Sequence, residues 1–109
     1  MHVLFVCSRN RFRSPTAEAL FSGHNSIETL SAGTAPDAET PLSAELIDWA
    51  DIIIAMEAVH RKRLKEQFRE LLDHKKLIVL GIPDKYRYMD PKLVELLLKK
   101  VLPMLPGER

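Results

Sequence analysis

A thiol, three guanidinium groups and two hydroxyls lie close together near the start of the chain, in the segment Cys7-Ser8-Arg9-Asn10-Arg11-Phe12-Arg13-Ser14. An apolar run, Val3–Val6, precedes this segment, and a helix start follows it. A strand-to-helix turn of this kind directs successive backbone N–H groups into a concave nest, and the positive end of the helix adds to their field. Both features favour a bound anion and the thiolate form of a cysteine. The segment therefore predicts a phosphate-binding loop with a reactive cysteine at its start.

Each end of this loop has a part in a covalent phosphoryl transfer. Cys7 is the candidate nucleophile, and the Ser14 hydroxyl can donate a hydrogen bond to its sulfur. The planar fork of Arg13 can bind two equatorial oxygens of a phosphoryl group. The alternative is that Cys7 is a small apolar residue that ends a buried strand. The arginine, serine and proline that follow favour the chemical interpretation.

The hydrophobic pattern predicts the elements that must position these residues. Short apolar runs indicate buried strands at Val3–Val6, Ile27–Leu30, Ile52–Ile54 and Leu77–Leu80. Helical spacing of apolar residues predicts helices from Ser14 to near Gly23, over Leu42–Ala50, over Glu57–Asp73, and from Asp90 to near Pro103. Strands that alternate with helices imply an α/β fold of three layers, with a four-stranded, mainly parallel sheet flanked by helices. We expect residues 1–109 to form one such domain.

Several details of these helices are specific predictions. Ser14 is expected to cap the first helix, with Pro15 at its first position. Trp49 is expected to pack its short helix against the sheet. The buried face of the helix over Glu57–Asp73 is expected to include Val59, Leu64, Phe68 and Leu71. The buried face of the last helix is expected to include Leu93, Leu96, Leu97, Val101 and Leu102.

The composition sets limits on location and partners. The 109 residues are 46% hydrophobic and 28% charged, and the formal net charge is +1, so no global field favours nucleic acid or membrane. Cys7 is the single cysteine, which excludes an internal disulfide and makes a reducing cytoplasm the expected location. Val3–Val6 is too short for a signal peptide or a membrane span. No histidine spacing suggests a metal site, and Arg61–Lys65 is expected to be a solvated helix face rather than a nucleic-acid contact.

Three stretches of the chain resemble the low-molecular-weight protein tyrosine phosphatases. They are Val3–Glu18, which contains Cys7, Asn10, Arg13, Ser14 and Pro15; Ser31–Thr34; and Ala50–Glu57. The resemblance implies a four-stranded parallel sheet flanked by helices, a cysteinyl-phosphate intermediate at Cys7, and no metal or other cofactor. It also implies a substrate that is a phosphorylated protein, above all at tyrosine, or a small phosphomonoester.

The resemblance further implies roles for residues that match the family pattern. Asn10 would hold a left-handed turn, a conformation that asparagine tolerates well. Ser14 and Ser31 would support that turn. Glu57 would pair with Arg13, although the family usually carries aspartate at this position.

Two aspartates are candidates for the general acid that protonates the leaving group. Asp84 follows the fourth expected strand, where the family places its acid, and we favour it. Asp90 precedes a proline, as the family's acid does, but a helix cap explains it fully. With Asp84 as the acid, Tyr86 and Tyr88 would form the aromatic wall of the substrate pocket. Packing against the last helix is the alternative for both tyrosines.

The chain departs from the family pattern in three places. The stretch between Thr34 and Ala50 is much shorter than usual, so part of the pocket wall is expected to be reduced. Phe12 stands where typical members carry a second cysteine, which removes reversible disulfide protection of the nucleophile. Arg9 and Arg11 stand where small or apolar residues are usual, and they either favour a multiply charged substrate or extend into solvent.

Other functions fit the same loop. Arsenate reduction occurs on related folds, but it relays electrons through additional cysteines, so here it would need an external thiol. A module that binds phosphate or a phosphopeptide without turnover also fits, as does a phosphocysteine carrier of the sugar-transport type. Turnover that depends on Cys7 distinguishes the enzyme from both. The sequence does not indicate an oligomeric state.

Overall fold

The computed structural model describes residues 1–105. Its helices and strands are β1(His2–Cys7), α1(Arg13–Phe21), β2(Glu28–Gly33), α2(Ala44–Trp49), β3(Ile52–Ala55), α3(Ala58–Phe68), β4(Lys76–Val79) and α4(Pro91–Val101). Short 3₁₀ turns follow three of the helices, at His24–Ser26, Arg69–Leu72 and Leu102–Met104. Within this range, every helix is too short or too polar to cross a membrane.

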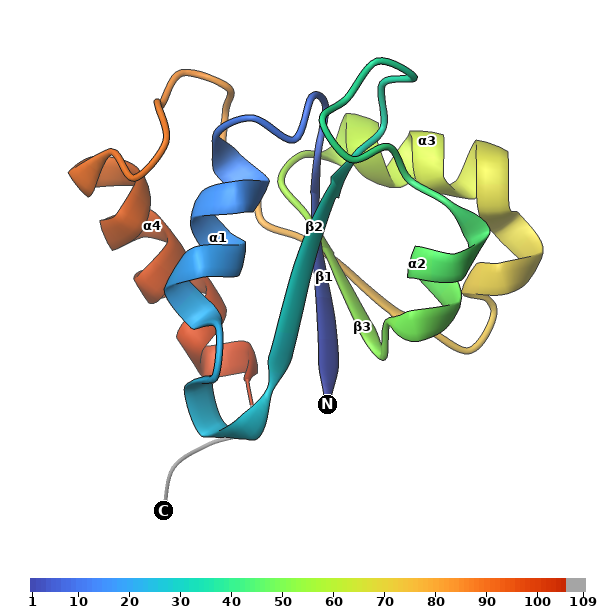
Figure 1. Cartoon of the computed structure of the whole chain (residues 1–109), viewed down its shortest axis with the longest axis horizontal. Coiled ribbons are helices and arrows are strands. Elements are labelled where there is room, and N and C mark those ends of the chain that lie inside the picture. Colours follow the sequence, from blue (N-terminus) through green and yellow to red (C-terminus); the bar gives the residue numbers. More distant parts are fainter. Residues whose placement is uncertain (106–109) are drawn as a thin grey trace.

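The four strands form one parallel sheet in the order β2-β1-β3-β4. Helices α1 and α4 cover one face of the sheet, and α2 and α3 cover the other (Figure 1). The predicted three-layer α/β fold is therefore confirmed. The loops that leave the carboxyl ends of β1, β2 and β4 gather at the upper edge in Figure 1, the edge at which ligands of parallel sheets bind.

The central strand β1 divides the core into two parts. Val3, Phe5 and Cys7 pack on the side of α1 and α4, whereas Leu4 and Val6 pack on the side of α2 and α3. All five side chains are buried. Burial on both faces explains why this strand is an unbroken apolar run, and it places the Cys7 thiol on the same face as the helix that follows it.

The second strand extends further than its sequence suggests. The predicted strand ends at Leu30, but β2 continues to Gly33. Ser31, Ala32 and Gly33 are small and have weak strand preferences, yet they pair with the last three residues of β1. Pairing and burial therefore outweigh intrinsic propensity, and they bring the end of β2 beside Cys7.

The prediction that Ser14 caps the first helix is wrong. α1 begins at Arg13, and Phe12 precedes it as the cap residue without a side-chain cap bond. The Ser14 hydroxyl is already bonded to Cys7 and Asn10. Pro15 consequently lies at the third helical position, where its missing N–H is still among those without an intrahelical acceptor.

The buried face of α3 is displaced from the predicted one. The helix spans Ala58–Phe68, and the chain then continues as a 3₁₀ turn, so the predicted single helix to Asp73 is divided. Val59 is 46% exposed and Leu71 is 41% exposed, contrary to prediction. Leu64 and Phe68 face inward as predicted, and His60, one turn before Leu64, joins them in the inward stripe.

Smaller differences affect the remaining elements. Leu102 is 39% exposed because α4 ends at Val101 and a 3₁₀ turn begins, whereas Leu93, Leu97 and Val101 are buried as predicted. Trp49 packs against the sheet on the side of α2, also as predicted, and its ring stacks on His2 with 4.3 Å between centroids.

Gly33 is the point at which the loop after β2 lies against the Cys7 loop. A Cβ atom added there would lie 2.5 Å from the Ala38 Cβ and 2.5 Å from the Ser8 carbonyl oxygen. We expect Gly33→Ala to lower the free energy of unfolding by about 3 kcal/mol or more, because both neighbours must shift. Urea unfolding measures this loss.

Gly23→Ala is the matched control for that prediction. Nothing lies within 4 Å of a Cβ added to Gly23, whose φ is +78°. The expected loss is therefore only the cost of the left-handed conformation, about 1–2 kcal/mol. Equal losses in the two variants would contradict a steric role for Gly33.

Candidate active site

Cys7 ends β1 at the floor of a small cavity. Its side chain is 3% exposed, and its Sγ lies 2.9 Å from the Ser14 Oγ. The cavity has a volume of about 100 Å³ and is lined by Cys7, Arg9, Arg11, Phe12, Arg13 and Asp84. A cavity of this volume can hold one tetrahedral anion.

Asn10 fixes the turn of the loop. Its φ is +59°, in the left-handed region that asparagine tolerates better than most residues. Its Nδ2 donates to the Ser14 Oγ at 3.0 Å and to the Ser31 Oγ at 2.9 Å, and its Oδ1 accepts from the Thr40 amide at 3.1 Å. Glu18 accepts in turn from the Ser31 hydroxyl. This buried network joins β1, α1 and the loop after β2.

The main-chain carbonyls of the loop point to one side. Their partners are the amides of the loop after β2, with Thr34 bonded to Cys7, Ala35 to Ser8 and Glu39 to Arg9 at 2.9, 2.9 and 3.1 Å. In a planar trans peptide the next N–H points opposite to the carbonyl, so the amides of residues 8–10 point away from that loop. None of the main-chain hydrogen bonds found among residues 1–105 is donated by residues 8–12. These donors remain available to an oxyanion.

Arg13 is held rigidly beside Cys7. The side chain is 2% exposed, and its Nη1 donates to the Glu57 Oε1 at 2.6 Å and to the Ile82 carbonyl at 2.8 Å. The contact with Glu57 is the one that the family resemblance implies. Because one nitrogen of the fork has two fixed partners, the orientation of the guanidinium plane is set before any ligand binds.

The structure distinguishes the two candidate acids. Asp84 lines the Cys7 cavity, and its Oδ1 lies 3.7 Å from the Arg13 Nε. Asp90 caps α4, where its side chain accepts from the Lys92 amide at 2.8 Å. Asp84 is therefore the carboxyl group at the cavity.

The two tyrosines predicted for the substrate wall, Tyr86 and Tyr88, lie outside the set of residues that line the small cavity. Tyr86 packs against the core on the side of α1 and α4, and Tyr88 is 52% exposed. The loop that carries them is tied to α1, because the Met89 amide donates to the Thr16 Oγ1 at 2.9 Å. The aromatic ring at the cavity is that of Phe12.

His60 is a residue of the site that sequence analysis missed. It is fully buried, and its Nδ1 lies 3.0 Å from the Glu57 amide while its Nε2 lies 2.8 Å from the Ser8 Oγ. The amide can only donate, so the neutral ring carries its proton on Nε2 and donates to Ser8. His60 thus connects the start of the phosphate-binding loop to Glu57, the partner of Arg13. The available signal was a histidine three residues after a predicted helix start.

The buried position of His60 predicts a pH dependence of stability. Burial lowers the pKa of His60 to about 4 from its ordinary 6.5, and the charge of Arg13 acts in the same direction. Between these two values the unfolded chain binds a proton that the folded protein excludes. The free energy of unfolding should therefore fall as pH falls from 6.5 to 4, by up to about 1.4 kcal/mol per pH unit.

Urea unfolding of the wild type and of His60→Gln at several pH values between 7 and 4 measures this effect. Glutamine keeps an amide donor and cannot titrate, so the variant should lose this component of the slope. Identical slopes for both proteins would show that other groups cause the pH dependence.

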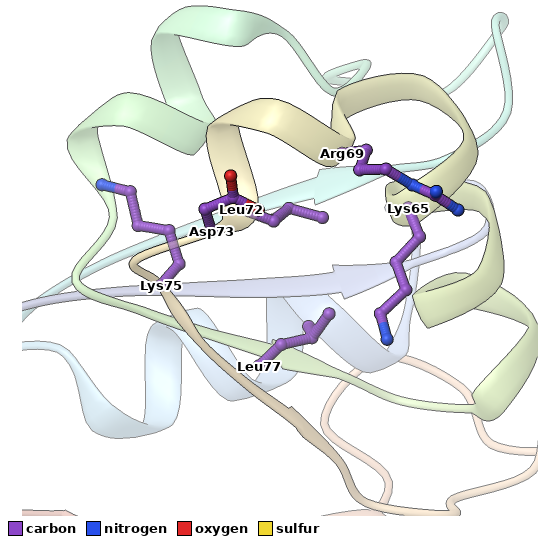
Figure 2. A pocket seen from close by; sticks show the side chains of 6 residues that line it. All are labelled: Lys65, Arg69, Leu72, Asp73, Lys75 and Leu77. Carbon is purple, nitrogen blue, oxygen red and sulfur yellow. The ribbon is translucent and has the colours of Figure 1, made fainter.

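A wider hollow of about 470 Å³ lies elsewhere, between α3, the turn after it and β4 (Figure 2). It is lined by Lys65, Arg69, Leu72, Asp73, Lys75 and Leu77. Lys75 extends away from the other side chains in Figure 2, and its Nζ donates to the carbonyls of Asp48 and Ala50 at 2.9 and 2.7 Å. This hollow has neither a thiol nor a nest of amides. The smaller cavity at Cys7 is therefore the candidate active site.

The chain is similar to known phosphatases. No protein-family model matches the chain. A protein-arginine-phosphatase of Bacillus subtilis (strain 168) is 31% identical, and the match covers 67% of this chain and 67% of that protein. A low-molecular-weight protein tyrosine phosphatase from T. tengcongensis has a similar structure, with a TM-score of 0.75, 26% identity, and coverage of 96% of this chain and 99% of that one.

A second solved structure is that of the YwlE arginine phosphatase in a mutant with a phosphorylated active-site serine. It gives a TM-score of 0.68 at 27% identity, and covers 96% of this chain and 100% of that one. These relatives are phosphatases of a single fold, and the names of two of them specify different phosphorylated side chains.

Proposed function

The chain belongs to the low-molecular-weight protein tyrosine phosphatase family, and from that premise we propose that it hydrolyses phosphorylated protein side chains through a cysteinyl-phosphate at Cys7. The observation that carries the proposal is the cavity in which Cys7, Arg13 and Asp84 meet beside amides with no main-chain partner. A nucleophile, an anion cradle and an acid in one small cavity are the parts that phosphoryl transfer requires.

In the first step, the Cys7 thiolate attacks phosphorus in line with the leaving group. The S–P bond forms while the bond from phosphorus to the leaving atom breaks, and Asp84 transfers its proton to that atom. The Ser14 hydroxyl stabilises the thiolate before attack, since its Oγ lies 2.9 Å from the sulfur. Arg13 and the loop amides hold the equatorial oxygens, where negative charge is spread in the transition state.

In the second step, water hydrolyses the cysteinyl-phosphate. The Asp84 carboxylate, which lost its proton in the first step, removes a proton from the water as its oxygen attacks phosphorus. The S–P bond breaks, the thiolate is restored, and inorganic phosphate leaves. Glu57 acts only through Arg13 in this scheme, because its carboxylate accepts a hydrogen bond from the guanidinium and does not line the cavity.

Two phosphorylated side chains are candidate substrates. Phosphotyrosine is the expectation from the family resemblance, whereas the 31% identical relative is named for arginine. The aromatic ring that lines the cavity is that of Phe12, and it is compatible with either side chain. We therefore propose a phosphoprotein phosphatase for which both side chains must be tested.

The test is turnover by the wild-type chain between pH 5 and 8 of p-nitrophenyl phosphate, a phosphotyrosyl peptide and a phosphoarginyl peptide of the same sequence. We expect release of inorganic phosphate that vanadate inhibits. The ratio of kcat/KM for the two peptides assigns the side chain. Phosphate binding by calorimetry without turnover of any of the three substrates would refute the proposal, and would favour a binding module or a phosphocysteine carrier.

A further inference from the structure

Two arginines at the mouth of the cavity have no task in the proposed reaction. Arg9 and Arg11 line the same cavity as Cys7, but their side chains are 61% and 59% exposed. Arg13 is buried and already supplies the guanidinium beside the sulfur. Their guanidinium groups therefore carry positive charge at the rim of the cavity rather than at its floor.

Each rim arginine is paired with a carboxylate on the loop after β2. The Arg9 Nη1 lies 3.1 Å from the Asp37 Oδ2, and the Arg11 Nε lies 3.7 Å from the Glu39 Oε1. The main chain of Glu39 is also held beside this loop, because its amide donates to the Arg9 carbonyl at 3.1 Å. The two pairs join the cavity rim to the neighbouring loop.

These ion pairs are exposed and therefore weak. The carboxylates of Asp37 and Glu39 are 67% and 65% exposed. Exposed ion pairs contribute little to stability, so another anion can take the place of either carboxylate at small cost. An arginine fork binds a carboxylate or a phosphate equally well by geometry. The pairs therefore hold the arginines in a geometry that can bind an anion, and the arginines can still exchange their partners.

Space for a neighbouring substrate group lies beside the second pair. Arg11 and Glu39 also line a hollow of about 620 Å³ that contains Phe12 and Pro15. The cavity at Cys7 is smaller, at about 100 Å³. A peptide whose phosphorylated side chain enters the small cavity would therefore have its adjacent residues over this wider hollow and the rim.

We propose that Arg9 and Arg11 form an anion subsite that selects phosphopeptides with a second anionic group beside the phosphorylated residue. The subsite deepens the proposed function and rests on it. Binding exchanges Asp37 and Glu39 for the anion of the substrate.

The test uses three peptides that differ only at the neighbours of the phosphorylated residue, which are alanine, glutamate or a phosphoserine. The phosphorylated residue itself is the one, tyrosine or arginine, that the wild type hydrolyses faster. For the wild type we expect the KM of an anionic peptide to be below that of the alanine peptide. In Arg9→Gln/Arg11→Gln the KM of the anionic peptide should rise about five- to thirty-fold relative to that of the alanine peptide.

The carboxylate variant gives a result of opposite sign. In Asp37→Asn/Glu39→Gln the arginines lose their internal partners, so the KM of the anionic peptide should fall about two- to five-fold relative to the alanine peptide. Preference for the glutamate or the phosphoserine peptide identifies the anion, and either supports the subsite. Equal KM changes for all three peptides in both variants would overturn it. Failure of the proposed function can be distinguished from failure of the subsite, because in the first case the wild type would hydrolyse none of the peptides.

Discussion

Cys7→Ser is expected to lower kcat for p-nitrophenyl phosphate by more than about 10⁴-fold. The variant replaces the nucleophilic sulfur with a hydroxyl that is a far weaker nucleophile at neutral pH, and nothing else at the cavity floor can form the covalent intermediate. The hydroxyl is small enough to keep the contact with Ser14, which lies 2.9 Å from the sulfur. Steady-state hydrolysis at pH 5 to 8 measures the loss.

The same variant distinguishes a lost nucleophile from a lost fold. Arg13 and the amides of residues 8–12 are unchanged, so Cys7→Ser should still bind inorganic phosphate in calorimetry with an affinity close to that of the wild type. Acid quenching of the wild type during turnover should also trap phosphate on the protein, and the variant should show no cysteine-bound phosphate. Residual turnover within tenfold of the wild type would exclude Cys7 as the nucleophile.

The parts of the site that were predictable from sequence are the local ones. Cys7, Asn10 and Arg13 belong to one loop whose spacing already implies a strand, a turn and a helix. The left-handed φ of Asn10 follows from its residue type and the tight turn. The position of the loop at the carboxyl edge follows from the alternation of strands and helices. In each case the determining residues are close in sequence.

The parts that were missed depend on partners distant in sequence. Ser14 was taken for a helix cap because its neighbours suggest one, but its hydroxyl is bonded to Cys7 across the loop. His60 is 52 residues from Ser8, its partner, and only the parallel pairing of β1 with β3 brings them together. The path of the loop with Tyr86 is set by contacts with α1, which no local pattern reveals.

The two aspartates illustrate how a distant contact decides a question that a motif leaves open. Both follow β4 within a short loop, and Asp90 has the proline neighbour that the family pattern favours. The helix that begins at Pro91 takes the Asp90 carboxylate as its cap. The Arg13 guanidinium, from the other end of the chain, lies 3.7 Å from Asp84 instead. The position of Asp84 at the cavity therefore favours it as the acid, although Asp90 has the proline that the family pattern places after its acid.

Asp84→Asn is accordingly expected to lower kcat by about 10²- to 10⁴-fold, the usual contribution of a general acid or base. Asp90→Asn should change kcat by less than about threefold and keep stability, because asparagine caps helices as well as aspartate does. Substrates with poorer leaving groups provide the decisive comparison. In Asp84→Asn, kcat should fall more for phenyl phosphate than for p-nitrophenyl phosphate, because the more basic phenolate depends more on a proton donor. A collapse of kcat in Asp90→Asn alone, or equal losses for the two esters in Asp84→Asn, would reassign the acid.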